Sequence, residues 1–323
     1  AEGSVISDAD IDVEAGTVTV DGEVVEDATI ITKQVLPMYP QASQVAPKQA
    51  GTNGGGVVGT NSSHPFENPN PASNIIEMTL LLLIPVALCF SFGFSIKNKK
   101  QGIAIFLAMF IMLVIALGVI GTQEQAATPA LEQNGAVDVI AGDGMPGGNM
   151  EGKETRFGIA TSSTWAAYTT AASNGSVNSM HDSYTPIGGM IPMLQMMLGE
   201  VIFGGVGCGL YGMIGFVILT VFIAGLMVGR TPEFLGKKIE PREMRMAVLL
   251  CLATPIAILI GSGIACLLPS TASALGNGGA HGLSEVLYNY ASAGGNNGSA
   301  FAGMNCDSPF LNTSIGLVML FVR

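Results

Sequence analysis

Three short polar tripeptides recur along the chain and carry the chemistry of cation binding. They lie 121 and 123 residues apart, and each ends in Asn-Gly: Thr52-Asn53-Gly54, Ser173-Asn174-Gly175 and Asn296-Asn297-Gly298. Main-chain carbonyl oxygens in such a loop can replace the hydration shell of an ion, and Gly adopts the dihedral angles that aim them inward. None of the tripeptides contains a carboxylate, which favours a monovalent cation held by dipoles over a divalent one held by charge.

A single Asn-Gly step is more often an ordinary surface turn, so the recurrence carries the interpretation. Each tripeptide is followed by an apolar segment, and the second and third come directly after half-length apolar segments at 158–172 and 282–293. The pattern predicts a repeated unit of membrane span, pore helix, filter loop and span.

The elements that position these loops are long apolar runs. Hydrophobic residues make up 49% of the chain and charged residues 11%. A helix needs about 20 apolar residues to cross a bilayer, and runs of about that length lie at 75–96, 102–121, 207–228 and 246–268. We expect an all-α polytopic membrane protein. The stretch 187–228 is too long for one span and must be broken, and Gly204, Gly205 and Gly207 mark the place.

The charge distribution predicts the orientation in the membrane. Eight of the 13 basic residues lie in two short loops, 97–100 and 230–245, while nine of the 24 acidic residues lie before position 28. Basic loops favour the cytoplasmic side, so the acidic stretches face outward. We expect a multi-pass protein of the cell (inner, cytoplasmic) membrane, in contact with the lipid bilayer and with no nucleic-acid partner.

The N-terminal 40 residues differ from the rest. Residues 17–25 alternate around Asp21-Gly22, which predicts a β-hairpin in a small extracytoplasmic segment. The chain starts at Ala1 in an acidic stretch and ends at Arg323 after a short apolar run. We expect both ends to be truncations, so that the chain is a fragment of a longer protein.

Other site types find little support. Residues 207–212 fit GxGxxG but lie in an apolar run with no preceding strand, and residues 147–153 resemble a Walker A loop followed by Glu154 instead of Ser or Thr. We therefore predict no catalytic residue and no bound nucleotide. His64, His181 and His281 lack a second ligand at metal-binding spacing, and the cysteines form no CxxC pair, so we predict no metal other than K+ and no disulfide framework.

Several longer motifs, in order along the chain, resemble the KdpA family, the potassium-binding subunits of the Kdp potassium-transporting P-type ATPase. They cover the chain from about Gln41 to Arg323 and include residues 51–56, 61–69, 169–175, 180–183, 199–207, 222–232, 281–288 and 296–303.

The resemblance implies four span–pore–span repeats around one K+ filter, formed here by the three tripeptides. The expected divisions are an extracytoplasmic segment at 1–40, a second repeat at 41–97, a third repeat with a broken second span at 98–228, and a cytoplasmic loop with a truncated fourth repeat at 229–323. The transported ion is K+. The implied partners are a P-type ATPase catalytic subunit, which hydrolyses ATP, and a small single-span accessory subunit. A stand-alone potassium channel or cation symporter of the same four-repeat superfamily is the alternative.

The family's gate below the filter corresponds here to the Gly204–Gly209 loop. Glu200 lies just before it inside an apolar stretch, and Arg230 and Arg323 lie at span ends. Because an ionisable group at membrane depth is usually paired or lines a pathway, we expect Glu200 to contact one of these arginines. The alternative is a Glu in an aqueous vestibule with arginines that snorkel to the interface.

Two departures from the family pattern concern the first filter loop. Pro47 lies inside the predicted pore helix, where it removes a hydrogen bond and favours a helix start or a kink. The loop then continues Val57-Val58-Gly59 in place of Phe-Phe-Asn. We therefore expect the geometry of the first filter loop to deviate most from the family pattern.

Overall fold

The computed structural model describes residues 9–12, 17–20, 23–24, 41–127, 139–143 and 145–323. The chain divides into two units, Ala1–Pro40 and Gln41–Arg323, which are described separately. In the first unit, strands β1 (Ala9–Asp12), β2 (Thr17–Val20) and β3 (Glu23–Val24) form an antiparallel sheet in the order β1-β2-β3. Thr19 pairs with Val24 across β2 and β3. The predicted turn residues Asp21 and Gly22 lie outside the described residues.

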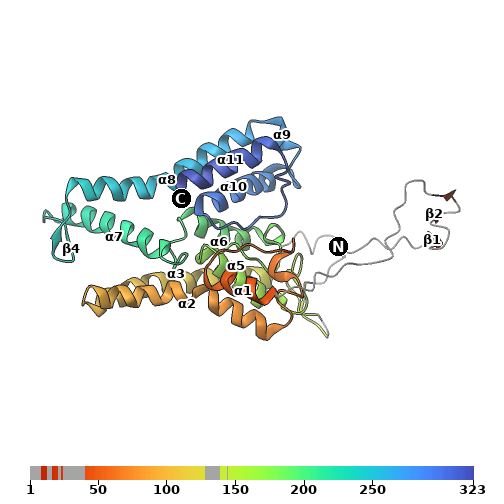
Figure 1. The fold of residues 1–323 in the computed structure, drawn as a ribbon, viewed down its shortest axis with the longest axis horizontal. Coiled ribbons are helices and arrows are strands. Elements are labelled where there is room, and N and C mark those ends of the chain that lie inside the picture. The colour runs from red at the N-terminus through yellow and green to blue at the C-terminus, as the bar shows by residue number, and fades with distance from the viewer. Residues whose placement is uncertain (1–8, 13–16, 21–22, 25–40, 128–138, 144) are drawn as a thin grey trace. The chain divides into compact units, whose positions relative to one another are not determined.

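The second unit is built from helices (Figure 1). In chain order these are α1 (Gln41–Ala50), the 3-10 helix η1 (Asn61–Ser63), α2 (Pro71–Ser95), α3 (Lys99–Ala126), α5 (Gly158–Ala171), the 3-10 helix η2 (His181–Ser183), α6 (Pro186–Met197), α7 (Cys208–Met227), α8 (Pro241–Cys266), α9 (Pro269–Ala272), α10 (Gly279–Gly295) and α11 (Pro309–Val322). A two-stranded hairpin of β4 (Glu233–Phe234) and β5 (Lys237–Lys238) connects α7 to α8.

Four helices, α2, α3, α7 and α8, are long and apolar enough to cross a membrane. They match the four predicted spans, so the prediction of a mostly helical polytopic membrane protein is confirmed. Their apolar surfaces are largely open: 11% of the most apolar window of α7 and 28% of each of the other three windows is buried. Such exposed apolar surfaces are suited to contact with lipid.

Both basic connections lie at the same end of the second unit. In Figure 1 the α2–α3 tip and the β4–β5 hairpin both lie at the left. At the α2–α3 tip a Cβ on Gly93 would lie 3.1 Å from the Cα of Gly102, so the two helices approach closely beside the lysine loop. The two basic loops thus share one end, and the assignment of that end to the cytoplasmic side stays a prediction.

Several helices begin at a Pro that follows a capping residue. Pro71, Pro186 and Pro309 occupy the first helical position of α2, α6 and α11. The preceding side chain then accepts from main-chain N–H groups: the Asn70 carboxamide accepts from Ala72 and Ser73. Proline fits this position because its missing N–H would have no partner within the helix. These caps fix where each apolar helix starts.

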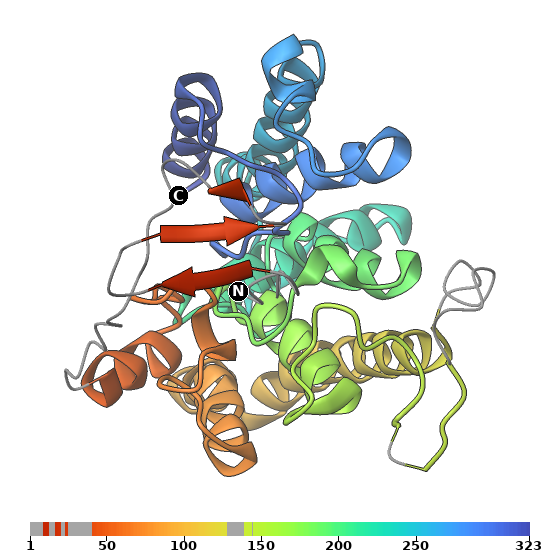
Figure 2. The ribbon, with the colours of Figure 1, turned by 90° about the vertical axis from the view of Figure 1, so that its right-hand side faces the viewer.

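The short helices α1, α5, α6 and α10 lie among the spans, and Figure 2 shows the elements of the second unit following one another in chain order around the view. The stretch 187–228 is broken as predicted, into α6 and α7, with the connection at 198–207 containing Gly204, Gly205 and Gly207. α10 ends directly before its Asn-Gly tripeptide, and one residue separates α1 and α5 from theirs.

Candidate ion-binding site

The three Asn-Gly loops share one backbone path. The first residue of each is in the left-handed region, with φ of +52° at Thr52, +55° at Ser173 and +59° at Asn296. The glycine that ends each tripeptide also has a positive φ, of +73° at Gly54, +87° at Gly175 and +91° at Gly298. A positive φ at a non-glycine residue is uncommon and costs of order 1–3 kcal/mol. Its recurrence at equivalent positions shows that the surrounding structure imposes this turn.

Each loop is closed by an equivalent hydrogen bond onto the end of its own short helix. The N–H of the central Asn donates to a carbonyl five residues earlier: Asn53 to Lys48 at 3.0 Å, Asn174 to Thr169 at 3.1 Å and Asn297 to Ser292 at 2.9 Å. The carbonyl ends of α1, α5 and α10 therefore point toward the loops, where they contribute partial negative charge.

The loops lie against one another, main chain to main chain. A Cβ on Gly54 would lie 1.6 Å from the carbonyl oxygen of Asn174, and a Cβ on Gly175 would lie 2.1 Å from that of Asn297. No side chain fits at either position. The first loop thus touches the second, and the second touches the third, which brings together tripeptides that are 121 and 123 residues apart.

The Asn side chains have two different environments. Asn174 and Asn297 are buried, with 0% and 2% of their surfaces exposed, and their carboxamides hydrogen-bond to main-chain groups. Asn53 is exposed and donates to the carbonyl of Pro47 in its own helix at 3.3 Å. The carboxamides of Asn174 and Asn297 are thus occupied by hydrogen bonds within the protein. The groups of these loops that could bind an ion are their main-chain carbonyls.

A cavity of about 890 Å³ lies beside the loops, and the first residue of each tripeptide, Thr52, Ser173 and Asn296, lines it. Its other walls come from the α6–α7 connection, α7, α8 and the end of α11. A partly dehydrated ion that passes the loops needs a cavity in contact with them, and this cavity meets that requirement.

One of the three predicted gate glycines lines this cavity. Gly205 lines the cavity, and a Cβ there would lie 3.1 Å from the Oγ1 of Thr52. Gly204 and Gly207 have φ of +68° and +99°, and the N–H of Gly204 donates to the carbonyl of Ala171 at the end of α5. The break between α6 and α7 is therefore in direct contact with the first two loops.

Glu200 is 1% exposed and has a positive φ of +51°. Its carboxylate lies against the last turn of α10, where a Cβ on Gly295 would be 3.1 Å from Glu200 Cδ. Ser173 and Asn297 are polar side chains beside it, although neither makes a hydrogen bond of normal geometry to its oxygens. In the described part of the chain, Glu200 forms no ion pair with Arg230 or Arg323.

The two arginines occupy different places. Arg323 lines the same cavity as the filter loops. Arg230 is exposed just after α7, at the end that carries the basic loops, and its N–H donates to the carbonyl of Gly225. The structure thus brings Arg323, but not Arg230, to the cavity beside the loops.

Pro47 lies inside α1, which continues unbroken to Ala50. The Pro47 carbonyl accepts the N–H of Gly51 at 2.8 Å, so the last turn closes normally. Despite Pro47, the first loop keeps the positive φ values and the loop-closing bond found in the other two.

Buried charge behind the first loop was not predicted from the sequence. The Nζ of Lys48 is paired with the carboxylate of Glu67 and also donates to Asn61 and to Ser62. The neighbouring Gln49 joins this network through Glu77 and Ser176. The available signal was a Lys beside a filter loop in a chain with very few charges.

A second buried ion pair lies behind the second loop. Lys153 Nζ is 2.8 Å from Glu124 Oε2, and both side chains are fully buried. The other carboxylate oxygen accepts from the N–H and the hydroxyl of Thr185, the residue that caps α6. Burial lowers the pKa of Lys153, and Glu124 opposes that shift. The pair joins the end of α3 to the start of α6.

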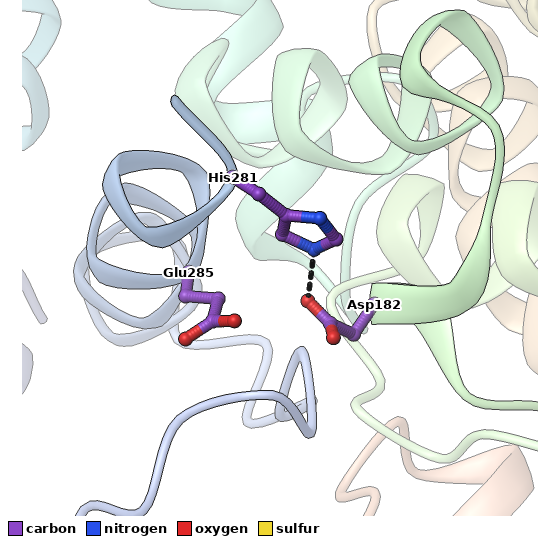
Figure 3. A group of neighbouring side chains, drawn as sticks. All are labelled: Asp182, His281 and Glu285. Carbon is purple, nitrogen blue, oxygen red and sulfur yellow. Dashed lines mark hydrogen bonds and ion pairs between the residues drawn. The ribbon is translucent and has the colours of Figure 1, made fainter. Parts of the chain in front are cut away.

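Asp182, His281 and Glu285 form the one group with metal-ligand chemistry among the described residues (Figure 3). Their ligand atoms lie within 4.8 Å of one another, and His281 Nε2 is 2.7 Å from Asp182 Oδ1. Both oxygens of Glu285 already accept main-chain N–H groups, from Gly276 and Asn277. The group thus resembles a hydrogen-bonded clamp, and the expectation of no metal other than K+ stays a prediction.

His181, next to that clamp, is buried and neutral. Its Nδ1 lies 2.6 Å from the hydroxyl of Tyr288 on α10, and its ring packs edge-on against Tyr184. Burial, together with the charge of Lys153, lowers the pKa of His181 to about 3. The residue therefore joins the segment after the second loop to α10, the helix before the third loop.

Four helices long and apolar enough to cross a membrane, together with short helices that end in left-handed loops, define a mostly helical polytopic membrane protein. Residues 10–323 match the KdpA family, described as "Potassium-transporting ATPase A subunit". The chain belongs to this family.

Curated relatives agree with this assignment. The chain is 72% identical over 298 residues to the "Potassium-transporting ATPase potassium-binding subunit" of Clostridium botulinum (strain Alaska E43 / Type E3), covering 92% of this chain and 51% of that protein. It is 66% identical over 300 residues to the subunit of that name from Clostridium perfringens, covering 93% and 52%. For the Desulfovibrio desulfuricans subunit the identity is 63% over 301 residues, covering 92% and 52%. The chain spans about half the length of the curated relatives it matches.

Proposed function

We propose that this chain forms the potassium-selecting part of the non-catalytic pore subunit of an ATP-driven potassium uptake pump. The observation that carries the proposal is the set of three loops with matching φ values, each closed onto its own helix, around one cavity. The tripeptides offer main-chain dipoles and no carboxylate, which suits K+. The relatives carry the name of a potassium-binding subunit.

Finer features of the assembly belong to the same proposal. Span, pore helix, filter loop and span form a repeated unit, with divisions at 1–40, 41–97, 98–228 and 229–323. The loops are the K+ filter, and Glu200 with the Gly204–Gly207 region and Arg323 controls passage below it. The N-terminal sheet faces outward from a multi-pass protein of the inner membrane. A P-type ATPase subunit hydrolyses ATP and a small single-span subunit accompanies it, while this chain binds no nucleotide.

The test uses the full-length subunit in its complete complex, reconstituted in proteoliposomes. We expect potassium uptake that requires ATP and stops when the ATPase subunit is inactivated. The alternative, a stand-alone channel or symporter, predicts potassium flux from the full-length subunit alone. Flux without the ATPase partner, or uptake that does not distinguish K+ from Na+, would contradict the proposal.

A further inference from the structure

The carboxamides of Asn174 and Asn297 each cross from one filter loop to the helix that carries the preceding loop. Asn174 Nδ2 donates to the carbonyl of Lys48 in α1 at 3.0 Å. Asn297 Nδ2 donates to the carbonyl of Thr169 in α5 at 2.8 Å. We propose that these two side chains are positioning residues: they set the spacing between neighbouring filter loops and through it the preference for K+. The inference rests on the proposed filter function.

The two acceptor carbonyls occupy equivalent places. Lys48 O and Thr169 O are the same carbonyls that accept the N–H of Asn53 and of Asn174 when each loop closes onto its own helix. A carbonyl has two lone pairs and can accept both bonds. Each acceptor thus receives a hydrogen bond from the next loop in addition to the bonding from its own loop, which for Lys48 O includes the N–H of Gly54 at 3.4 Å. The loops are tied together at the point where each one turns.

The other end of each carboxamide holds its own loop. Asn174 Oδ1 accepts the N–H of Ser176 at 2.8 Å, and Asn297 Oδ1 accepts the N–H of Ser299 at 3.0 Å. These are Asx-turn contacts, which fix the chain as it leaves the filter. Both side chains are buried, so loss of the crossing donor would remove the bond that joins two neighbouring loops and leave the acceptor carbonyl bonded only to its own loop.

The close approach of neighbouring filter loops explains why the distance between them matters. Gly54 and Gly175 lie so close to the carbonyls of Asn174 and Asn297 that no Cβ fits between neighbouring loops. A filter that replaces the hydration shell with carbonyl oxygens depends on the number and placement of those oxygens. A side chain that fixes the distance from one loop to the next therefore influences the choice of ion without touching the ion.

Asn174→Asp and Asn297→Asp test the inference in the complete complex with the full-length subunit. Aspartate keeps the oxygen that accepts from Ser176 or Ser299 and loses the crossing donor. It also brings a negative charge to the loops, which the uncharged Asn174→Ser variant described below does not. Asn289→Asp is the matched control, because Asn289 donates to the carbonyl of Glu285 within its own helix. The readouts are the half-saturating concentrations of K+ and Rb+ for ATP-driven uptake, the turnover at saturating K+, and the thermal stability of the assembled complex.

We expect each filter variant to raise the half-saturating K+ concentration by roughly tenfold, equal to about 1.4 kcal/mol. The ratio of the Rb+ to the K+ value should fall toward one, while turnover at saturating K+ changes much less. The control should keep wild-type values. A merely structural role would lower stability and turnover together without changing the ratio.

Unchanged K+ and Rb+ values in both filter variants would overturn the inference. If an Asp variant does not assemble, Asn174→Ser replaces it: the hydroxyl can keep the turn contact to Ser176 but is too short to reach Lys48 O, so the same shift is expected. If the wild-type complex takes up K+ selectively and the variants behave like it, only the positioning role is rejected. Wild-type complex without K+ selectivity rejects the proposed function itself.

Discussion

Glu124 and Lys153 form an ion pair of 2.8 Å in which neither side chain is exposed. The carboxylate is shared with Asn149 and with Thr185, so the end of α3, the segment before α5 and the start of α6 meet at one buried group. An ion pair in such a place adds little as a pair, but removal of one partner leaves the other charge buried and unpaired.

Lys153→Met should therefore destabilise the subunit by about 3–5 kcal/mol. The measurement is thermal unfolding of the purified complex in detergent or nanodiscs, with Lys237→Met as the control because Lys237 is exposed on β5. Equal melting temperatures of the two variants would show that Glu124 finds another partner.

Gly175→Ala should damage the filter itself. A Cβ at this position would lie 2.1 Å from the carbonyl oxygen of Asn297, and the residue has a φ of +87°. We expect the half-saturating K+ concentration for uptake to rise by roughly tenfold or more, equal to about 1.4 kcal/mol or more. Gly118→Ala on α3 is the control, because a Cβ there meets nothing within 4 Å. Potassium affinity that survives the Gly175 change would place this loop outside the filter.

His181 should make the protein less stable in acid. Its pKa is lowered to about 3 in the folded protein, whereas an unfolded His titrates at about 6.5. Between these values the unfolded chain binds more protons, so stability is fully present above about pH 6.5 and falls as the pH drops toward 3. Tyr184, Tyr288 and Lys153 face the ring and supply no carboxylate to stabilise the charged form.

His181→Asn removes the titrating group. The variant complex should therefore lose less stability between pH 6.5 and 4 than the wild-type complex does. Melting temperature as a function of pH measures the slope, and His64→Asn serves as the control because His64 is less buried. Identical slopes for wild type and His181→Asn would assign the acid sensitivity to other groups.

Glu200→Gln tests the proposed role of the Glu200 carboxylate in ion passage. Glu200 is buried, lies against Gly295 and is followed by the break between α6 and α7. An ionisable group at this depth is usually part of an ion path, so we expect K+ turnover to fall by roughly tenfold, the effect of about 1.4 kcal/mol. Turnover and thermal stability that both match the wild type would rule out a role in passage.

The sequence predicted the spans well because their signals are local, while the role of the loops as a filter stays a prediction. Four apolar runs can be read in short windows, as can the three Asn-Gly tripeptides spaced by 121 and 123 residues, and the break after Met197 follows from a length that no single span needs. The direction of the Asn side chains could not be predicted in this way. Asn174 reaches a carbonyl 126 residues away, and neither residue type indicates that contact.

The buried charges were missed for a similar reason. Lys48 finds Glu67, and Lys153 finds Glu124, only after helices from different parts of the chain pack together. The predicted contact of Glu200 with an arginine rested on a general cost of burying charge. That cost limits where a charge can lie, but it does not name the neighbour.

The crossing carboxamides all run in one direction, from a later loop to an earlier helix. Such a contact is heterologous: each unit presents a donor on one side and an acceptor on the other, as subunits do in cyclic oligomers. Mutational effects should then be strongly non-additive between adjacent loops and nearly additive between loops that do not touch. The spacing of the three loops would then depend on both contacts together, and the second loop, which takes part in both, would be the least free to relax alone.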